Sequence, residues 1–262
     1  MVLLDHGGRH PSEVQLIAPP PDLGWLVEHL WVQGSHGVVT GWRVVADASP
    51  YLIASVTDGN RARCLNIQLV GARSHAATVN VTNRVLTVGV RLRPGVLPGV
   101  TGESAREFVD RGVAVDRVFS RRLLSDLELG HDAPTAIILR ELVRLMRRLP
   151  RRDARPLLPA WPLRIASVRG LAQWLDTAPR SLRDRAIFDA GLSPKRLLRV
   201  LRLHAALRAA WTDNVPWSAV AYLAGYADQA HLTREVRALL GETPSAWRAR
   251  GSAVSFKTPA RG

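Results

Sequence analysis

The stretch from Val220 to Trp247 constrains the fold more than any other part of the sequence. Its second half carries an apolar stripe at positions i, i+4, i+7 and i+8, namely Leu232, Val236, Leu239 and Leu240. That spacing predicts an amphipathic helix. Gly225 stands where a preceding helix must end, because glycine adopts the left-handed backbone conformation of a sharp turn at low cost. Asp228 is placed to cap the following helix. The sequence therefore predicts two helices joined by a tight turn.

Polar and basic side chains lie opposite the apolar stripe of the second helix. At about 100° per residue, the free face and its flanks hold Gln229, Ala230, His231, Thr233, Arg234 and Arg237. A short helix of this kind behind a tight turn suits insertion into the major groove of DNA. The alternative from geometry alone is a corner of two helices with a solvated polar face.

The sequence GYADQAHLTREVRALLGETPSAW resembles the second helix-turn-helix of the AraC/XylS family of bacterial transcription regulators. The resemblance lies in Gly225-Tyr226, Asp228-Gln229, Leu232, Arg234 and Gly241-Glu242-Thr243-Pro244 with Trp247. It covers roughly the last hundred residues. It implies a regulator that binds double-stranded DNA in the bacterial cytoplasm, associated with the nucleoid, with RNA polymerase, a small-molecule effector and a second copy of the chain as candidate partners.

An earlier segment resembles the first helix-turn-helix of the same family. Val168–Leu175 is expected to form a short helix, and a second helix starts near Pro179, which fits the first turn because its missing N–H is not needed there. The outward residues of this second helix are Arg180, Ser181, Arg183 and Asp184. Asp184 departs from the family, which usually has a basic residue there, and Ala186 replaces an aromatic core residue. Asp184 would repel phosphates but could accept a hydrogen bond from cytosine N4.

A long helix should join the two units. Gly191 ends one helix, Ser193 can cap the next and Pro194 can open it. A helix from there to about Trp211 is about 28 Å long, which could hold two recognition helices near one turn of DNA apart. Its basic side chains could contact the DNA backbone or form a solvated face; they are Lys195, Arg196, Arg199 and Arg202.

The first part of the chain is rich in strand-like segments. Short runs of alternating or β-branched residues occur at 26–33, 42–45, 52–56, 65–70, 78–81 and 85–92, with glycine-bearing turns between them. This spacing indicates an antiparallel barrel or sandwich. Residues 1 to about 20 are polar and proline-bearing, and we expect an irregular lead-in there. Gly89 to Gly95 resembles a motif of a poorly characterised β-rich domain that often precedes this type of DNA-binding domain.

The β-rich part offers no pattern typical of an enzyme. His29, His36 and His75 are scattered, without the close histidine pair and carboxylate that a cupin metal site needs. The lone Cys64 excludes an internal disulfide framework and a multi-cysteine zinc site. We therefore expect no catalytic residue, no metal ligand and no cofactor.

Several side chains of the β-rich part have a structural and a functional interpretation. Trp25, Trp31 and Trp42 are expected in the core, with a pocket wall as the alternative. Arg91 and Arg93 project to one face of the last strand. They could bind an anionic effector, although a solvated or salt-bridged face is the favoured interpretation.

Residues 102 to 149 change to a helical period. Segments 103–111, 118–129 and 134–149 are predicted helices, and the last has a strong apolar side. Helices behind a small barrel serve dimerisation in regulators that resemble this chain. The proline-punctuated segment after Leu149 is the best domain boundary. The predicted organisation is a β-rich domain with helices at 1–149, a linker at 150–162, a double helix-turn-helix domain at 163–250 and a tail at 251–262.

The basic charge of the chain is concentrated in its second part. Residues 151–262 hold 19 Lys and Arg against 8 Asp and Glu, whereas residues 1–150 hold 17 against 14. The net charges are therefore +11 and +3 within a total of +14. Phosphate neutralisation requires such an excess where the helix-turn-helix units lie. No apolar run is long enough to span a membrane, and the start of the chain does not have the pattern of a signal peptide.

The sequence thus predicts an α+β protein, with a β-rich barrel-like domain followed by an all-α domain of two helix-turn-helix units. The expected function is sequence-specific DNA binding by a transcription regulator that inserts two recognition helices into successive major grooves. The alternatives are an enzyme in the β-rich domain that the helical domain targets to DNA, and an architectural DNA binder without sequence preference.

Overall fold

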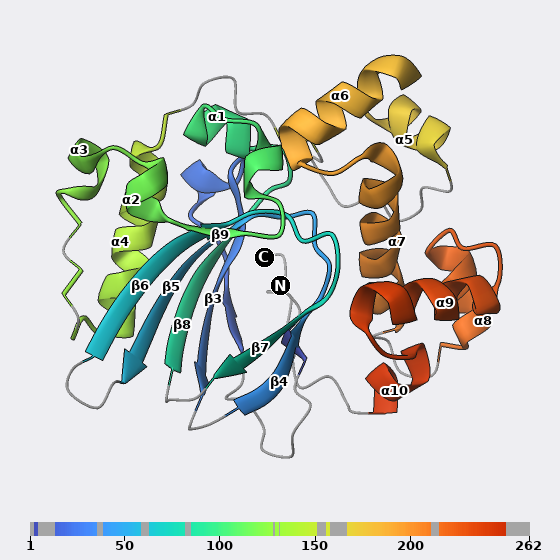
Figure 1. Cartoon of the computed structure of the whole chain (residues 1–262), viewed down its shortest axis with the longest axis horizontal. Coiled ribbons are helices and arrows are strands. Elements are labelled where there is room, and N and C mark those ends of the chain that lie inside the picture. The colour runs from blue at the N-terminus through green and yellow to red at the C-terminus, as the bar shows by residue number, and fades with distance from the viewer. Residues whose placement is uncertain are drawn as a thin grey trace.

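The structure, a computed structural model, describes residues 3–4, 14–35, 39–58, 63–81, 85–127, 129–130, 132–150, 156–157, 167–210 and 215–249. Figure 1 shows a β-rich N-terminal domain beside a helical C-terminal domain. The predicted α+β fold class is therefore confirmed. Most of the predicted linker and all of the predicted tail lie outside the described residues.

The N-terminal domain is built on antiparallel sheets. The larger sheet has the strand order β2 (Gln15–Ile17), β3 (Val27–Ser35), β8 (Val85–Leu92), β5 (Tyr51–Asp58), β6 (Arg63–Val70) and β9 (Gly112–Ala114). The smaller one has the order β1 (Leu3–Leu4), β4 (Val39–Val44) and β7 (Ala77–Val81). Each segment predicted as a strand from the sequence contributes to one of the two sheets. The predicted irregular lead-in is partly wrong, because Gln15–Ile17 pairs with Leu30–Val32 of β3.

Helix α4 (Thr135–Arg148) covers one face of the larger sheet, as the apolar side of the predicted helix at 134–149 requires. Ile138, Leu142 and Leu145 are fully buried and join the core that contains Leu52 and Val90 of the sheet. Burial of these side chains supplies about 1.5–3 kcal/mol each. The sheet and α4 therefore enclose the main core of the N-terminal domain.

The other two helices predicted for this region are wrong in form. Segment 103–111 contains only the short 3-10 helix η2 (Ala105–Phe108), because Asp110 adopts φ 57° and turns the chain into β9. Segment 118–129 is split into α2 (Val115–Val118) and α3 (Arg121–Leu124), since Phe119 and Ser120 are extended. Helix α1 (Leu97–Thr101) was not predicted, because it contains Pro98 and Gly99, which are both poor helix formers. Burial of Leu97 and Val100 stabilises this helix.

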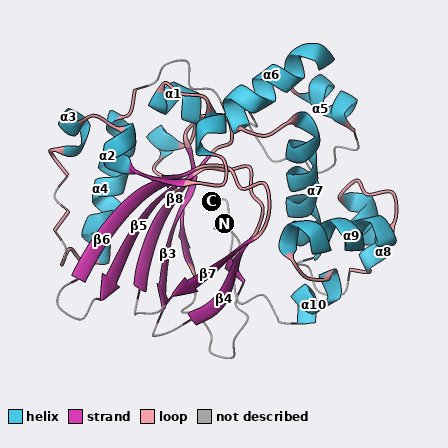
Figure 2. Ribbon diagram, in the orientation of Figure 1, coloured by secondary structure: helices cyan, strands magenta, loops and turns pink. Residues whose placement is uncertain are grey.

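The C-terminal domain is all helical in the part that the structure describes (Figure 2). Its helices are α5 (Val168–Trp174), α6 (Pro179–Ala190), α7 (Pro194–Ala210), α8 (Trp217–Leu223), α9 (Gln229–Leu240) and α10 (Pro244–Ala249). The expected turns are present: Gly191, Gly225 and Gly241 have positive φ, and Ser193 Oγ accepts the Arg196 amide at 3.4 Å. Helix α7 is the predicted long helix.

Helix α7 is buried around most of its circumference, with Leu197, Leu201 and Leu203 among its buried side chains. Its neighbours are α5, α6, α8 and α9 of its own domain. The hydrophobic cluster around α7 also includes Val45, Ala46, Ala48 and Ala72 of the N-terminal domain. The two domains therefore share one apolar core along this helix.

A buried polar network lies inside this apolar contact. Arg91 of β8 donates from both terminal nitrogens to the carboxylate of Asp47, at 2.6 and 3.0 Å, and from Nε to Glu28 of β3 at 2.7 Å. Tyr51 hydroxyl hydrogen-bonds to both Asp47 and Arg91. His204 of α7 donates from Nε2 to the carbonyl of Ala46 at 2.9 Å and lies 3.6 Å from Asp47. The network thus reaches from the sheet to the central helix of the other domain.

Burial and charge fix the protonation of this network. Burial alone would raise the pKa of Asp47, but Arg91 and then His204 hold it below its ordinary value. Burial lowers the pKa of His204 to about 4, and Asp47 offsets only part of that effect. Near neutral pH the network therefore contains an ionised aspartate, a charged arginine and a neutral histidine.

The neutral state of His204 makes stability pH-dependent. Since the folded pKa of about 4 is below the unfolded value of 6.5, the unfolded chain binds the proton first. The stabilisation is complete above pH 6.5 and is lost as the pH falls toward 4. We expect His204→Gln to reduce the loss in free energy of unfolding between about pH 7.5 and pH 5 by about 2 kcal/mol.

Chemical denaturation of the wild type and His204→Gln at these two pH values measures the difference. His75→Gln is the matched control, because His75 is an exposed histidine of the N-terminal domain. Equal pH dependence in the wild type and His204→Gln would contradict a buried neutral His204.

Candidate nucleic-acid interface

Helix α9 is positioned by the turn that the sequence predicts. Gly225 has φ 77°, and Asp228 Oδ1 accepts the His231 amide at 2.6 Å as the cap of α9. The predicted apolar stripe is buried: Leu232, Val236, Leu239 and Leu240 each have 3% exposure or less. The opposite face of α9 is therefore the one presented to solvent.

The six residues predicted on the free face of α9 divide into two groups. Gln229, Ala230, Arg234 and Arg237 are exposed. His231 and Thr233 are half-buried and bond within the protein. Thr233 Oγ1 donates to the Gln229 carbonyl at 2.9 Å, and His231 Nδ1 accepts the Ala227 amide at 3.3 Å. These two side chains stabilise the first turn of α9.

The ring of His231 also packs on its neighbour from the turn. It meets Tyr226 edge to face, with ring centroids 5.2 Å apart. Tyr226 is itself buried against α7, where Arg202 lies 6.0 Å from its ring centroid. The turn before α9 is thereby tied to the central helix.

Helix α6 presents the four residues predicted for the first unit. Arg180, Ser181, Arg183 and Asp184 are all exposed and lie in its first half. Its inward side consists of Leu182, Ala186 and Ala190. Ala186 is fully buried, so the small side chain found in place of the family's aromatic residue still faces the core.

The C-terminal end of α6 is held by the N-terminal domain. Ser104 Oγ donates to the Phe188 carbonyl at 3.4 Å. A Cβ on Gly191 would lie 2.8 Å from the Ala105 carbonyl oxygen and 2.3 Å from Val109 Cγ2, so only glycine permits this approach. The first half of α6 points away from this contact in Figure 1.

The basic residues of α7 were expected either to contact the DNA backbone or to form a solvated face, and only some of them fit these roles. Lys195 and Arg196 are exposed. Arg199 instead donates from Nε to Glu235 of α9 at 2.6 Å, with side-chain exposures of 34% and 20%. This ion pair and the Arg202–Tyr226 contact fix the second helix-turn-helix on α7.

Helix α10 is fastened to the same unit by a further arginine. Arg248 lies 3.8 Å above the ring centroid of Trp217 in α8 and donates to the Val215 carbonyl at 2.9 Å. Trp247 is buried, as the terminal aromatic of the predicted motif should be. Helices α8, α9 and α10 thus form one packed unit at the far end of α7 (Figure 1).

Sequence reasoning missed the residues that join the domains. The sequence favoured a solvated or salt-bridged face for Arg91, and the ion pairs of Arg91 with Asp47 and Glu28 confirm the salt bridges. Arg93 donates to the Gly24 carbonyl at 2.6 Å. Asp47 and His204 were not singled out, because a lone aspartate before a strand and a histidine within an apolar helix carry no local signal. Trp31 is buried as expected, Trp25 is half-buried, and the side chain of Trp42 lies outside the described residues.

Among the described residues, no group of three or more His, Cys, Asp or Glu is arranged to hold a metal ion. In that same part of the chain, no helix has the length and apolarity to cross a membrane. His36 lies outside the described residues.

Two protein families match the chain. A family described as "Helix-turn-helix domain" matches residues 171–250, and a "Domain of unknown function (DUF6597)" matches residues 15–114. With exposed cationic helices on the matched helical domain, the chain is a DNA-binding transcriptional regulator. Its C-terminal domain is a helix-turn-helix domain of the AraC type, joined to an N-terminal DUF6597 domain.

Comparison with solved structures returns ToxT from Vibrio cholerae. A crystal structure of ToxT from strain O395 has a TM-score of 0.40 and 10% identity, covering 82% of this chain and 96% of that one. The unsaturated fatty acid-bound wild-type ToxT of strain SCE256 has a TM-score of 0.36 and 9% identity, covering 92% and 96%. No curated protein matches the chain by sequence.

The Arg199–Glu235 pair provides a test of how the second unit is held. We expect Arg199→Ala to weaken binding to the preferred DNA sequence while leaving the salt dependence of binding unchanged, because the side chain positions α9. Arg196→Ala is the control on the same helix. An exposed arginine that contacts a phosphate should reduce the slope of log K against log salt by about 0.9 when removed.

A double-mutant cycle with Glu235→Ala completes this test. Two residues in one ion pair should show non-additive losses, so the double variant should bind almost as well as either single variant. Fluorescence anisotropy over a salt series measures both quantities. Additive losses, or a reduced salt slope for Arg199→Ala, would make Arg199 a phosphate contact.

Proposed function

We propose that this regulator binds DNA sequence-specifically by inserting α6 and α9 into successive major grooves on one side of the duplex. The observation that carries the proposal is the exposure of the first halves of both helices, with their arginines, at opposite ends of the buried helix α7. Recognition helices contact base edges mainly through their N-terminal residues. The first halves of α6 and α9 supply such residues.

The length of α7 suits this arrangement. Its 17 residues correspond to about 26 Å, against about 34 Å for one turn of DNA. Helix α6 leads directly into α7, whereas α9 packs against the side of α7, where Glu235 pairs with Arg199. Any remaining shortfall would be met by bending the DNA toward the protein.

Each exposed side chain has a proposed role set by its chemistry. Gln229 suits adenine, Arg234 suits guanine, and Ala230 suits the thymine methyl group. Arg180 and Arg183 are the corresponding base-reading candidates of α6, with Asp184 as an acceptor for cytosine N4. Ser181 and Arg237 suit phosphates, as do Lys195 and Arg196. His231 and Thr233 contribute by fixing the start of α9.

The N-terminal domain is proposed to modulate this binding. Its Ser104 and Ala105 contact the end of α6 at Phe188 and Gly191, and its Ala46 and Asp47 lie against His204 of α7. A change in the N-terminal domain would therefore be transmitted to the helices that carry the reading residues. A small-molecule effector, a second copy of the chain or RNA polymerase could cause it. The proposed setting is the bacterial cytoplasm, at the nucleoid.

Selection of binding sites from random DNA tests the proposal. We expect the full-length protein to select two conserved segments about 10 base pairs apart. We expect Arg234→Ala to relax base preference at one position, at a cost of about 1–3 kcal/mol there. Arg248→Ala is a control, because Arg248 contacts Trp217 and Val215 within the protein.

Two outcomes would contradict the proposal. Equal affinity for selected and random duplexes at one salt concentration would indicate an architectural binder without sequence preference. A reduced salt slope with unchanged base preference in Arg234→Ala would assign Arg234 to a phosphate.

A further inference from the structure

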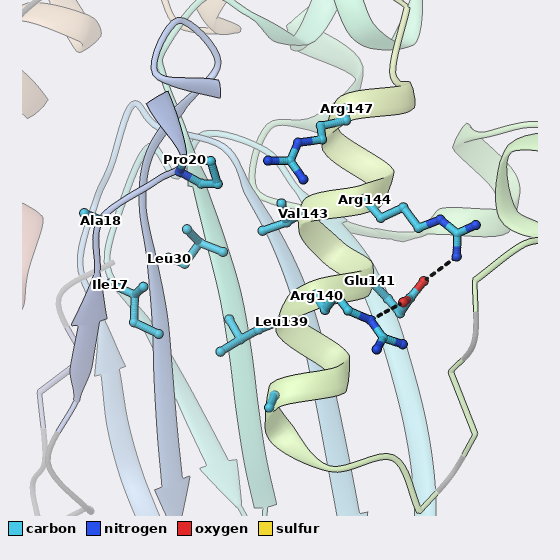
Figure 3. A pocket seen from close by; sticks show the side chains of 11 residues that line it. Ile17, Ala18, Pro20, Leu30, Leu139, Arg140, Glu141, Val143, Arg144 and Arg147 are labelled. Atoms are coloured by element: carbon cyan, nitrogen blue, oxygen red, sulfur yellow. Dashed lines mark hydrogen bonds and ion pairs between the residues drawn. The ribbon is translucent and has the colours of Figure 1, made fainter. Parts of the chain in front are cut away.

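A pocket lies between the sheet of the N-terminal domain and helix α4 (Figure 3), and α4 is on the side of the domain away from the DNA-binding helices (Figure 1). Its volume is about 730 Å³, within the range of about 300–1,000 Å³ typical of small-molecule sites. Strands β2 and β3 form one wall and α4 forms the other. The role proposed above for the DNA-binding helices uses none of its residues.

The walls of the pocket are apolar. Ile17 of β2 and Leu30 of β3 face Leu139 and Val143 of α4 across it (Figure 3). Leu139 and Val143 are half-buried, although a helix face packed against a sheet normally buries such side chains. An apolar body of a ligand would complete their burial, at about 25 cal/mol per Å² of apolar surface removed from water.

The rim of the pocket is basic. Arg140, Arg144 and Arg147 of α4 line it, and each side chain is about half exposed, at 56%, 47% and 52%. They share two carboxylates: Glu141 pairs with Arg140 and Arg144 at 2.9 and 3.5 Å, and Asp22 pairs with Arg147 at 2.8 Å. Three positive charges against two negative charges leave one net positive charge at the rim.

Arginine determines which anion this rim suits. Its planar guanidinium presents five N–H donors in a geometry that matches a carboxylate or a phosphate. The single net positive charge at the rim favours the singly charged carboxylate. The Arg147–Asp22 pair is exposed, and such pairs contribute little to stability, so a second carboxylate can share or replace Asp22 at small cost. The pocket therefore combines an apolar interior with a carboxylate-binding edge.

We propose that this pocket binds an organic anion with an apolar body, namely a carboxylate carrying an aliphatic or aromatic group. The inference deepens the proposed function, on which it rests for its regulatory meaning, by placing the effector site of the N-terminal domain. Two connections lead from the pocket toward the DNA-binding domain. Leu30 of the wall is two residues from Glu28 on β3, which pairs with Arg91. Helix α4 ends at Arg148, just before the segment that leads to the DNA-binding helices.

Leu157, in the described part of that segment, belongs to the hydrophobic cluster around α7. Leu157 donates its amide to the Pro94 carbonyl at 2.7 Å, and Gly95 approaches Leu157 so closely that a Cβ would meet its amide nitrogen at 2.3 Å. A shift of α4 on ligand binding would therefore act on the chain beside Arg91 and Arg93.

Isothermal titration calorimetry of the full-length protein with decanoate and phenylacetate, in the absence of DNA, tests the proposal. We expect saturable binding at one site per chain for at least one of the two carboxylates. The corresponding neutral amides should bind about tenfold more weakly, because each 1.4 kcal/mol of lost ionic interaction is a factor of ten. Since no DNA is present, the result does not depend on whether the proposed groove insertion is correct.

Three variants locate the binding. Leu139→Glu places a like charge in the wall and should abolish binding. Arg147→Gln should weaken it about tenfold and Arg147→Lys should restore part of it, by the same conversion. Arg148→Gln is the matched control, because Arg148 is next on α4 and pairs with Asp126 but does not line the pocket. Thermal unfolding and circular dichroism check that each variant is folded.

Several results would overturn the proposal. They are the absence of saturable binding by both carboxylates, equal binding of acids and amides, and binding that Leu139→Glu and Arg147→Gln leave unchanged. Sedimentation in the same buffer supplies a further one: a dimer that Leu139→Glu converts to a monomer would mean that a second copy of the chain occupies this face.

Discussion

The contact that organises this regulator is the one that helix α7 makes, through His204, beside the buried ion pair of the N-terminal domain. Asp47 and Arg91 form a two-point ion pair with almost no solvent exposure, and His204 meets the backbone at Ala46 beside it. A buried ion pair adds little net stability compared with apolar residues, but removal of one partner is costly. We infer that its value here is geometric, because His204 of α7 lies 3.6 Å from Asp47 and bonds to the neighbouring carbonyl of Ala46.

The charges of this network are balanced across the domain boundary. Glu28 and Asp47 pair with Arg91 in the N-terminal domain. The charges of all three residues act on the pKa of Arg208 of α7. His204 and Arg208 are four residues apart, so both project from the same side of α7. The side chains of Val45, Ala46, Ala48 and Ala72 surround the network with apolar packing. Asp47, Arg91 and Glu28 are bonded to one another within the N-terminal domain, and the hydrogen bond from His204 to Ala46 links this network to α7.

That arrangement gives the two helix-turn-helix units different environments. The first is attached to the N-terminal domain through the end of α6, whereas the second is attached to α7 through Arg199 and Tyr226. A signal from the N-terminal domain would therefore reach α6 and α7 directly and α9 through α7. The proposed pocket lies between the sheet and α4, and β3 connects it to the same network through Glu28.

The sequence was most informative where local chemistry determines structure. The caps and turns at Asp228, Gly225 and Gly191 and the stripes of α4 and α9 could all be predicted, because each depends on neighbouring residues along the chain. Strands β3, β5, β6 and β8 of the larger sheet could be located from their alternation, whereas the three-residue strands β2 and β9 could not. The exposed residues of α9 followed from helical periodicity, and those of α6 from the resemblance to the first helix-turn-helix of the AraC/XylS family. The short helices between β8 and α4 could not, since burial against the sheet rather than propensity determines their ends.

Long-range pairing was beyond the reach of the sequence. Asp47 and Arg91 are 44 residues apart, and the backbone acceptor of His204 is 158 residues away. Contacts between residues so far apart produce no periodic pattern in the sequence. The same holds for Arg199, whose partner Glu235 lies 36 residues further on; a basic helix face looked equally suited to DNA or to solvent. Residues that position the reading helices are therefore hidden in a single sequence, whereas residues on their free faces are not.

The most direct measurement is a hydroxyl-radical footprint of the full-length protein on a selected DNA site. The account predicts two protected segments about 10 base pairs apart, both on one side of the duplex, one for α6 and one for α9. Substitution of Arg180 and Arg183 by alanine should remove one segment, and substitution of Gln229 and Arg234 should remove the other. A single protected segment, or loss of both segments from either pair of substitutions, would contradict independent insertion of two helices held by α7.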